Sequence, residues 1–131
     1  MNDIIVDDFQ KIISESLIRH KSILDIMTKS SESNSRVNRA IAKSVSRCGC
    51  INIAAHKQRI PDNATLADVP NTLSYQIEGK LCASCQEVVQ KEIGSSIYYL
   101  AAICDALELN LYDIIIEQYD KLKTLGKFTM L

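Results

Sequence analysis

The sequence predicts an all-α fold: a four-helix bundle in which one long, proline-containing crossover loop joins the second and third helices. Apolar residues recur at steps of three and four over most of the chain, as they do on one face of a helix. Alternating, strand-like runs are scarce, and both prolines, Pro61 and Pro70, fall within one segment. We therefore expect a single helical domain over residues 1–131.

The first two helices are predicted on either side of a polar segment. Residues 3–28 carry an apolar stripe at helical spacing, and residues 37–58 carry a second stripe with several alanines. Between them, residues 29–35 are rich in Ser and Asn, which are typical of loops. Two amphipathic helices joined by a short polar loop are therefore expected.

The crossover loop is predicted over residues 59–79, because two prolines with Asp and Asn around them interrupt regular structure. One short helical turn is expected at residues 65–69. A third helix follows over residues 80–107, and its long apolar stripe indicates a central position in the bundle.

The fourth helix has recognisable signals at both ends. Asn110 is a good N-cap, and Asp113, at the third helical position, favours the positive end of the helix. Gly126 stands where a left-handed C-terminal cap belongs. The last helix is thus expected between these residues.

Composition limits the function classes that suit the chain. With 131 residues, 47% of them apolar, the core is large enough not to need disulfides. The 15 Lys and Arg residues nearly balance the 16 Asp and Glu residues, so no DNA or RNA binding is expected. An acidic N-terminus and the lack of an apolar run of about 20 residues predict no signal peptide or membrane span. We expect a cytoplasmic protein whose five cysteines stay reduced.

The last two predicted helices resemble a known enzyme family. Residues 91–107 read KEIGSSIYYLAAICDAL, and residues 111–115 and 120–123 read LYDII and DKLK. These segments resemble MazG-like nucleotide pyrophosphohydrolases. The resemblance implies an α-helical, usually oligomeric protein that splits nucleoside triphosphates into monophosphate and pyrophosphate. It also implies magnesium, held by an E-E-x-x-E motif on one helix and an E-x-x-D motif on the next.

The physical basis of such a site is that carboxylates three or four residues apart share one helix face and supply the oxygen ligands that magnesium prefers. The bound metal polarises phosphoryl oxygens and helps to generate the attacking hydroxide. By the resemblance, Glu92 is a metal ligand, Tyr99 stacks on a base and Lys121 contacts phosphate. Each also has a plainer role: Glu92 as a solvent-facing acid, Tyr99 as a packing aromatic and Lys121 as a cation near a helix C-terminus.

The chain departs from the family pattern in two places. Ser95 stands where the E-x-x-D motif has its aspartate, and no carboxylate lies between Arg36 and Arg59, where the E-E-x-x-E motif belongs. Other acids on the third and fourth helices do not recreate the family spacing; these are Glu87, Asp105 and Glu117. Catalytic activity is therefore left open.

Four of the cysteines form two close pairs that suggest a different chemistry. Cys48 and Cys50 flank one glycine, and Cys82 and Cys85 lie three residues apart. Four thiolates suit tetrahedral zinc or an iron–sulfur cluster. The second pair shares a helix face, whereas two residues apart means about 200° around an ideal helix. A common metal site therefore requires the chain to break at Gly49.

Other roles for the cysteines stay open. Free cysteine is a favoured small residue in helical cores, and a reversible Cys82–Cys85 disulfide is a third option, although no thioredoxin-like pattern surrounds it. Cys104 lies within an apolar stripe and is expected in the core. His56 follows Cys50 by six residues and is either a further ligand or an exposed side chain.

The sequence thus supports two function classes. The first is a divergent MazG-like protein that binds or hydrolyses nucleoside triphosphates with magnesium. The second is a non-enzymatic helical interaction module in which the four paired cysteines hold a structural or regulatory metal. A helix-mediated homodimer is expected in both.

Overall fold

The computed structural model describes residues 2–17, 21–65 and 68–125, which belong to two compact units. The first unit combines Met1–Asn38 with Gln90–Leu131, and the second is Arg39–Val89, so the second is inserted in the sequence of the first. The prediction of a mainly helical protein is confirmed. Whether the two units form a single domain, as the sequence suggests, stays a prediction.

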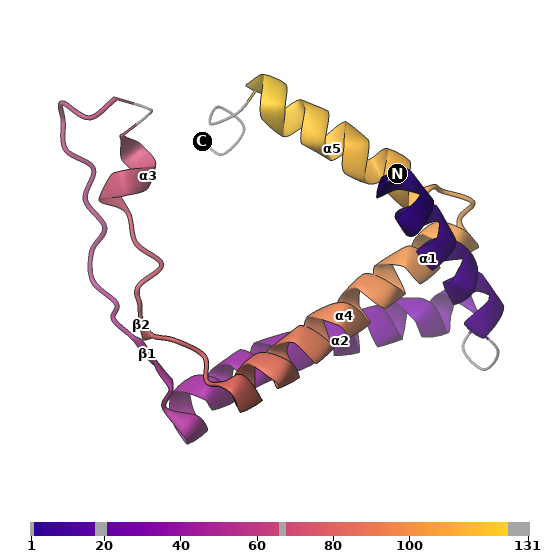
Figure 1. The fold of residues 1–131 in the computed structure, drawn as a ribbon, viewed down its shortest axis with the longest axis horizontal. Coiled ribbons are helices and arrows are strands. Elements are labelled where there is room, and N and C mark those ends of the chain that lie inside the picture. The colour runs from indigo at the N-terminus through magenta and orange to yellow at the C-terminus, as the bar shows by residue number, and fades with distance from the viewer. Residues whose placement is uncertain (1, 18–20, 66–67, 126–131) are drawn as a thin grey trace. The chain divides into compact units, whose positions relative to one another are not determined.

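Four long helices account for most of the described residues (Figure 1). These are α1 (Asn2–Ser16), α2 (Ile23–Lys43), α4 (Ala83–Ala106) and α5 (Leu111–Leu125). Of these, α2 runs from the first unit into the second, and α4 runs back from the second into the first. The predicted third helix, residues 80–107, agrees with α4 to within three residues at its start.

The core of the first unit is small. Its buried members come from α1, α2 and α4, and they are Ile13, Leu17, Ile26, Ala101 and Ala102. Two of these buried residues are adjacent alanines on α4, whose short side chains are fully covered by the residues around them. Half-buried side chains pack around this centre, namely Phe9, Tyr98, Ile103 and Leu111.

The turn between α4 and α5 is held by side chains of α1. Gln10 donates from Nε2 to the Leu109 carbonyl at 2.8 Å and accepts from the Leu111 amide at 2.9 Å. The predicted N-cap is confirmed, because the Asp113 amide donates to Asn110 Oδ1 at 2.9 Å. The predicted C-cap, Gly126, lies outside the described residues.

The predicted loop at residues 29–35 is wrong, since this segment lies inside α2. The predicted first helix, residues 3–28, is also wrong at its end, because α1 ends at Ser16. The chain instead interrupts its helices between Ser16 and Ile23. There, the Ser22 carbonyl accepts from the Ile26 amide at 2.9 Å, and Asp25 lies in the first turn of α2. Serine followed by an acid three residues later is a helix-start pattern.

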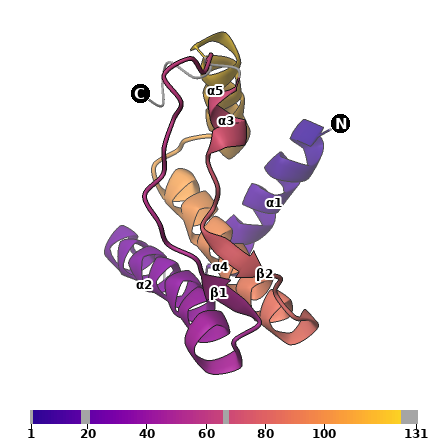
Figure 2. The same cartoon turned by 90° about the vertical axis from the view of Figure 1, so that its left-hand side faces the viewer.

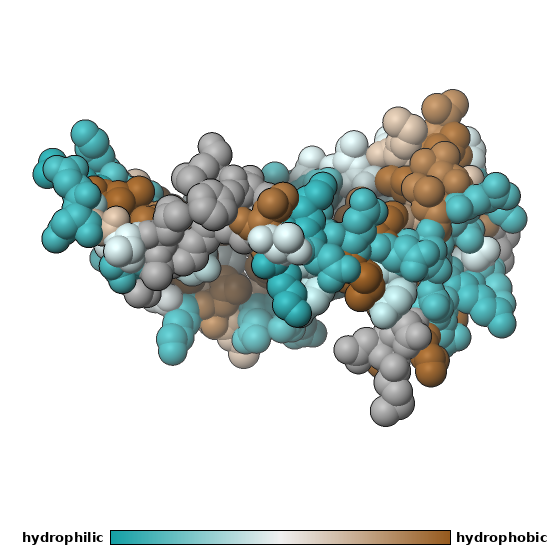
Figure 3. Space-filling view, turned by 90° about the horizontal axis from the view of Figure 1, so that it is seen from above, coloured by the Kyte–Doolittle hydropathy of each residue, from teal (hydrophilic) through white to brown (hydrophobic). Residues whose placement is uncertain are grey.

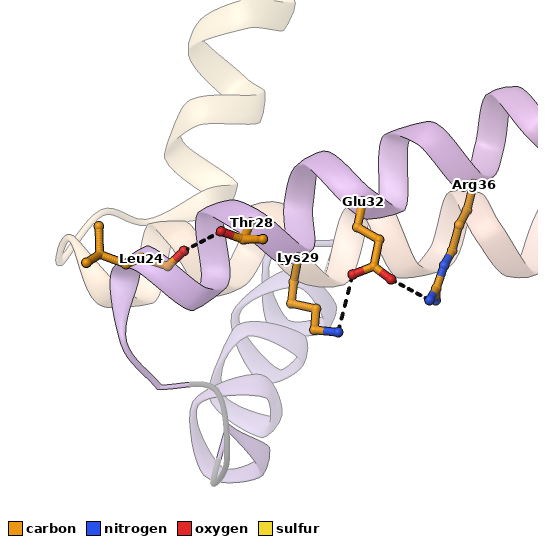
Figure 4. A network of polar contacts seen from close by, with 5 residues as sticks. All are labelled: Leu24, Thr28, Lys29, Glu32 and Arg36. Atoms are coloured by element: carbon orange, nitrogen blue, oxygen red, sulfur yellow. Dashed lines mark hydrogen bonds and ion pairs between the residues drawn. The ribbon is translucent and has the colours of Figure 1, made fainter.

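Local side-chain interactions explain why the polar segment is helical (Figure 4). Glu32 accepts from Lys29 at 3.3 Å and from Arg36 at 2.6 Å, one turn away on either side. The hydrogen bond from Lys29 and the positive charges of Arg36 and Lys29 lower the pKa of the Glu32 carboxyl. The Thr28 hydroxyl donates to the Leu24 carbonyl at 2.9 Å, so polar groups find partners within the helix.

The second predicted helix, residues 37–58, ends too late, and the reason is a glycine. After Lys43 the helix widens into one π-helical turn, η1 (Ser44–Cys48), and Gly49 then adopts a left-handed conformation with φ of 76°. Such a residue commonly terminates a helix. The chain leaves it as a short strand, β1 (Ile51–Ile53).

A two-stranded antiparallel sheet, which the sequence analysis missed, closes the predicted crossover loop (Figure 2). β2 (Ile77–Gly79) pairs with β1 in the register Ile51 to Gly79 and Ile53 to Ile77. The signal available in the sequence was the alternation of Ile51 and Ile53 about Asn52 in β1; β2 contains a single isoleucine, Ile77. Within the loop, the Thr65 carbonyl accepts from the Asp68 and Val69 amides, close to the predicted turn, and the short helix α3 (Val69–Thr72) follows.

Candidate metal centre

The two predicted cysteine pairs meet in the second unit. Cys48 ends η1, Cys50 precedes β1, and Cys82 and Cys85 lie at the start of α4. Their four sulfurs all lie within 4.8 Å of one another, and Cys48 Sγ is 3.8 Å from Cys82 Sγ. Residues 34 positions apart in the chain are thus brought to one point.

The first pair reaches this point because the helix breaks at Gly49, as the sequence analysis required. The Gly49 amide donates to the Ser44 carbonyl at 2.9 Å, which closes the wide last turn. The left-handed glycine then reverses the chain, so Cys50 no longer projects from the opposite side of the helix. Its thiol lies 3.8 Å from the Ser44 carbonyl, which it can donate to.

The second pair is positioned by the first turn of α4. The Cys82 carbonyl accepts from the Gln86 amide at 2.9 Å, and Cys82 Sγ accepts from the Cys85 amide at 3.4 Å. Cys82 therefore takes the place of a helix N-cap, with sulfur as the acceptor. The amides of a helix N-terminus favour a thiolate there.

A second glycine, Gly79, allows the two pairs to approach each other. It has a left-handed φ of 86°, and a Cβ at this position would lie 2.5 Å from the Cys50 carbonyl oxygen. Its partner in the β1–β2 ladder is Ile51, the residue after Cys50. Nothing in the sequence around Gly79 reveals this role, because the constraint comes from a segment that is remote in sequence.

Electrostatic interactions within the cluster shift the pKa values of its thiols in opposite directions. The hydrogen bond from the Cys85 amide, together with the Cys85 thiol, lowers the pKa of Cys82 to about 7. A hydrogen bond with Ser44 lowers the pKa of Cys85, but the Cys82 sulfur, burial and the other two thiols outweigh it and raise the pKa to about 12. Four negative sulfurs this close repel one another, so a bound cation is needed to keep all of them deprotonated.

The dimensions of the cluster suit a single tetrahedral ion. Zinc–sulfur bonds of about 2.3 Å in a tetrahedron place the sulfurs about 3.8 Å apart. That separation equals the distance between Cys48 Sγ and Cys82 Sγ, and the largest separation in the group, within 4.8 Å, is only modestly greater. Small side-chain rotations would complete the coordination.

The remaining cysteine and the candidate histidine lie outside this cluster. Cys104 is buried in α4, where burial raises the pKa of its thiol, and the prediction of a core position is confirmed. His56 is exposed; its Nδ1 lies 3.3 Å from the Lys57 carbonyl, and its amide donates to Gln76 Oε1 at 2.8 Å. His56 does not belong to the group of potential metal ligands.

The residues named from the family resemblance lie on α4 and α5. Glu92 and Tyr99 are half-buried on α4, where the Tyr99 ring packs edge-on against Tyr98 at 5.0 Å between centroids, and Lys121 is exposed on α5. Across residues 2–17, 21–65 and 68–125, the cysteines form the one group of three or more potential ligands close enough to share a metal. Among the described residues of a single chain, no carboxylate cluster around Glu92 meets that condition.

No family model matches the sequence, and no curated protein or solved structure is significantly similar to it. In the part of the chain that the structure describes, no helix combines the length and apolar content needed to cross a bilayer. The geometry of the cysteine cluster therefore carries the functional argument.

Proposed function

We propose that this chain is a non-enzymatic helical interaction module built around a mononuclear zinc site, with Cys48, Cys50, Cys82 and Cys85 as its four thiolate ligands. The observation that supports this most directly is the mutual approach of the four sulfurs to within 4.8 Å. Two separate helix ends and a β-hairpin converge to produce it, each with its own positioning device. A chance gathering of core cysteines would not require such devices.

The same distances favour one ion over an iron–sulfur cluster. In an iron–sulfur cluster the cysteine thiolates bind different iron atoms, so their sulfurs lie farther apart than they do around a single ion. Cysteines that all lie within 4.8 Å of one another leave room for one ion at their centre. Among single ions, zinc is the one most often bound by four cysteines in structural sites.

The proposed role of the metal is to hold the second unit together. Within the described part of Arg39–Val89, the buried apolar side chains are Ala40, Ile51 and Val89, which make a very small core. A core this small gives a unit of this size little stability, and natural proteins of similar size often add a metal or disulfides. The ion would tie the end of η1 to the start of α4 and fix the base of the hairpin between them.

Elemental analysis of tag-free protein, purified without added metal under anaerobic conditions, tests the proposal. We expect about one zinc per chain in the wild type, and its loss in Cys82→Ser. Cys104→Ser is the matched control, because it removes a thiol that lies outside the cluster. Protein that carries no metal and shows five reactive thiols would contradict the proposal.

Nucleotide hydrolysis stays a prediction that rests on the resemblance of residues 91–107 to MazG-like enzymes. It is tested separately, by magnesium-dependent release of pyrophosphate from nucleoside triphosphates. Activity that is lost in Glu92→Gln but kept in Glu87→Gln, an exposed acid on the same helix, would support it. Absence of release would leave the zinc module as the function of the chain.

A further inference from the structure

The four clustered cysteines are not equally accessible. Cys48 is exposed, whereas Cys50, Cys82 and Cys85 are half-buried and Cys104, outside the cluster, is buried. Structural zinc sites are normally closed to reagents. Metal binding would hold Cys48 as a thiolate, and its exposure leaves that sulfur within reach of molecules that arrive from solvent.

The exposed sulfur also has a reaction partner in contact. Cys48 Sγ lies 3.8 Å from Cys82 Sγ, close to the sum of two sulfur radii, and a disulfide requires about 2.05 Å. The two residues belong to different segments, η1 and the chain before α4. Each sulfur can therefore move toward the other by rotation about its own Cα–Cβ bond.

We propose that this metal centre is also an oxidation site for hydroperoxides, at which the Cys48 thiolate attacks the peroxide and the Cys82 thiolate resolves the sulfenic acid that forms. The inference rests on the proposed zinc site and adds a reaction to it. Its product is a Cys48–Cys82 disulfide together with a released metal ion. The second unit would then exchange a metal crosslink for a covalent one.

The chemistry balances without any further reagent. The Cys48 thiolate attacks one peroxide oxygen, the O–O bond breaks, and a sulfenic acid forms while the leaving hydroxide takes up a proton. The Cys82 thiolate then attacks the Cys48 sulfur, and the S–O bond breaks to release a second hydroxide, which is also protonated. In sum, two thiolates, one hydrogen peroxide and two protons give one disulfide and two waters.

Release of the metal follows from the loss of ligands. Zinc does not change its oxidation state in this sequence, but two of its four thiolates become disulfide sulfurs, which are poor ligands. The remaining thiolates, Cys50 and Cys85, cannot retain a tetrahedral ion against a chelator. One zinc should thus leave for each disulfide that forms.

The experiment treats zinc-loaded protein with hydrogen peroxide and follows zinc release with a chromogenic chelator, alongside a thiol count. Trypsin cleaves after Arg47, Lys57, Lys80 and Lys91, so the two cysteine pairs fall in the peptides 48–57 and 81–91. We expect these peptides to be crosslinked, with fragmentation that places the bond between Cys48 and Cys82. Disulfides within each peptide, with no crosslink, would overturn the proposal.

Two variants separate the reaction from the metal site itself. Cys48→His keeps four zinc ligands but removes the exposed thiolate, and it should slow release by at least about tenfold. Cys104→Ser should release zinc at the wild-type rate. Zinc that stays bound after peroxide treatment, with all thiols intact, would overturn the oxidation site and leave the zinc module standing; protein that never held zinc would overturn both.

Discussion

Two glycines determine how the four sulfurs meet, and they act by different physical means. Gly49 has a left-handed φ of 76°, but a Cβ there would have open space around it. Gly79 has a left-handed φ of 86° and also lies against the backbone of Cys50, where a Cβ would approach the carbonyl oxygen to 2.5 Å. Substitution at Gly49 is opposed by backbone conformation alone, whereas at Gly79 it is opposed by conformation and by contact.

This difference predicts a graded series of zinc affinities. Gly49→Ala should weaken zinc binding by roughly tenfold, because a left-handed alanine costs about 1–2 kcal/mol and metal binding is coupled to folding of the site. Gly79→Ala should weaken it further, since the backbone must also shift. Chelator competition measures both, with Gly94→Ala, whose Cβ meets nothing within 4 Å, as the control. Equal affinities for all three variants would contradict the assigned roles.

The two cysteine pairs could be recognised in the sequence as candidate ligands, but the backbone geometry that brings their sulfurs together could not be predicted in full. Pair spacing shows which thiols share a helix face and which need a break, and Gly49 was identified in this way. The role of Gly79 depends on the β1–β2 register, which places it opposite Ile51. A contact between segments this far apart follows from pairing that spacing rules do not reveal.

Among the elements, those with strong terminal signals were predicted best. α5 begins directly after Asn110, and α4 keeps close to its predicted bounds. The predicted central position of α4 is not borne out by its side chains, because Val88, Ile93, Ile97 and Leu100 are exposed. α2 was divided wrongly because Ser and Asn near residues 29–35 are typical of loops, while the ion pairs of Glu32 and the burial of Ser33 favour a helix. Local interactions of this kind outweigh single-residue propensity.

The cap of α5 can be tested by mutation. Asn110→Ala should reduce the free energy of unfolding by about 1 kcal/mol, because it leaves the Asp113 amide without its acceptor. Asn110→Ser should retain most of the stability, since a serine hydroxyl also caps well. Urea denaturation of zinc-loaded protein measures both. Equal destabilisation by the two substitutions would indicate that the second contact of Asn110, from Nδ2 to Asp7, dominates instead.

The hairpin should depend on the metal more than the helices of the first unit do. A two-stranded sheet is marginally stable alone, and β1 and β2 are three residues each. Removal of zinc by a chelator should therefore speed amide exchange in both strands and at Ala54, which donates to the Gln76 carbonyl. Hydrogen exchange with mass spectrometry measures this. Unchanged protection of the strands after metal removal would contradict a structural role for the ion.

At the scale of the whole molecule, many large apolar side chains remain uncovered. In the first unit, α5 contains no buried residue, and its exposed apolar side chains are Ile114, Ile115, Ile116, Tyr119, Leu122 and Leu125. Hydrophobic residues are visible among hydrophilic ones on the face shown in Figure 3. Apolar surface of this kind on a helix is typical of a surface that packs against a partner. The expected homodimer would cover it with a second copy.

Self-association through the apolar side chains of α5 should make the chain a dimer in solution. Light scattering coupled to gel filtration should give twice the chain mass of 14.6 kDa. Leu122→Glu, which places a charge among the exposed apolar residues of α5, should shift the protein toward the monomer. Thr124→Glu adds the same charge two residues away, on the opposite side of the helix, and should leave the dimer intact. A wild-type protein that is monomeric at all concentrations would contradict the prediction. Equal effects of the two substitutions would also contradict it, because the added charge, and not the loss of a specific apolar contact, would then explain both.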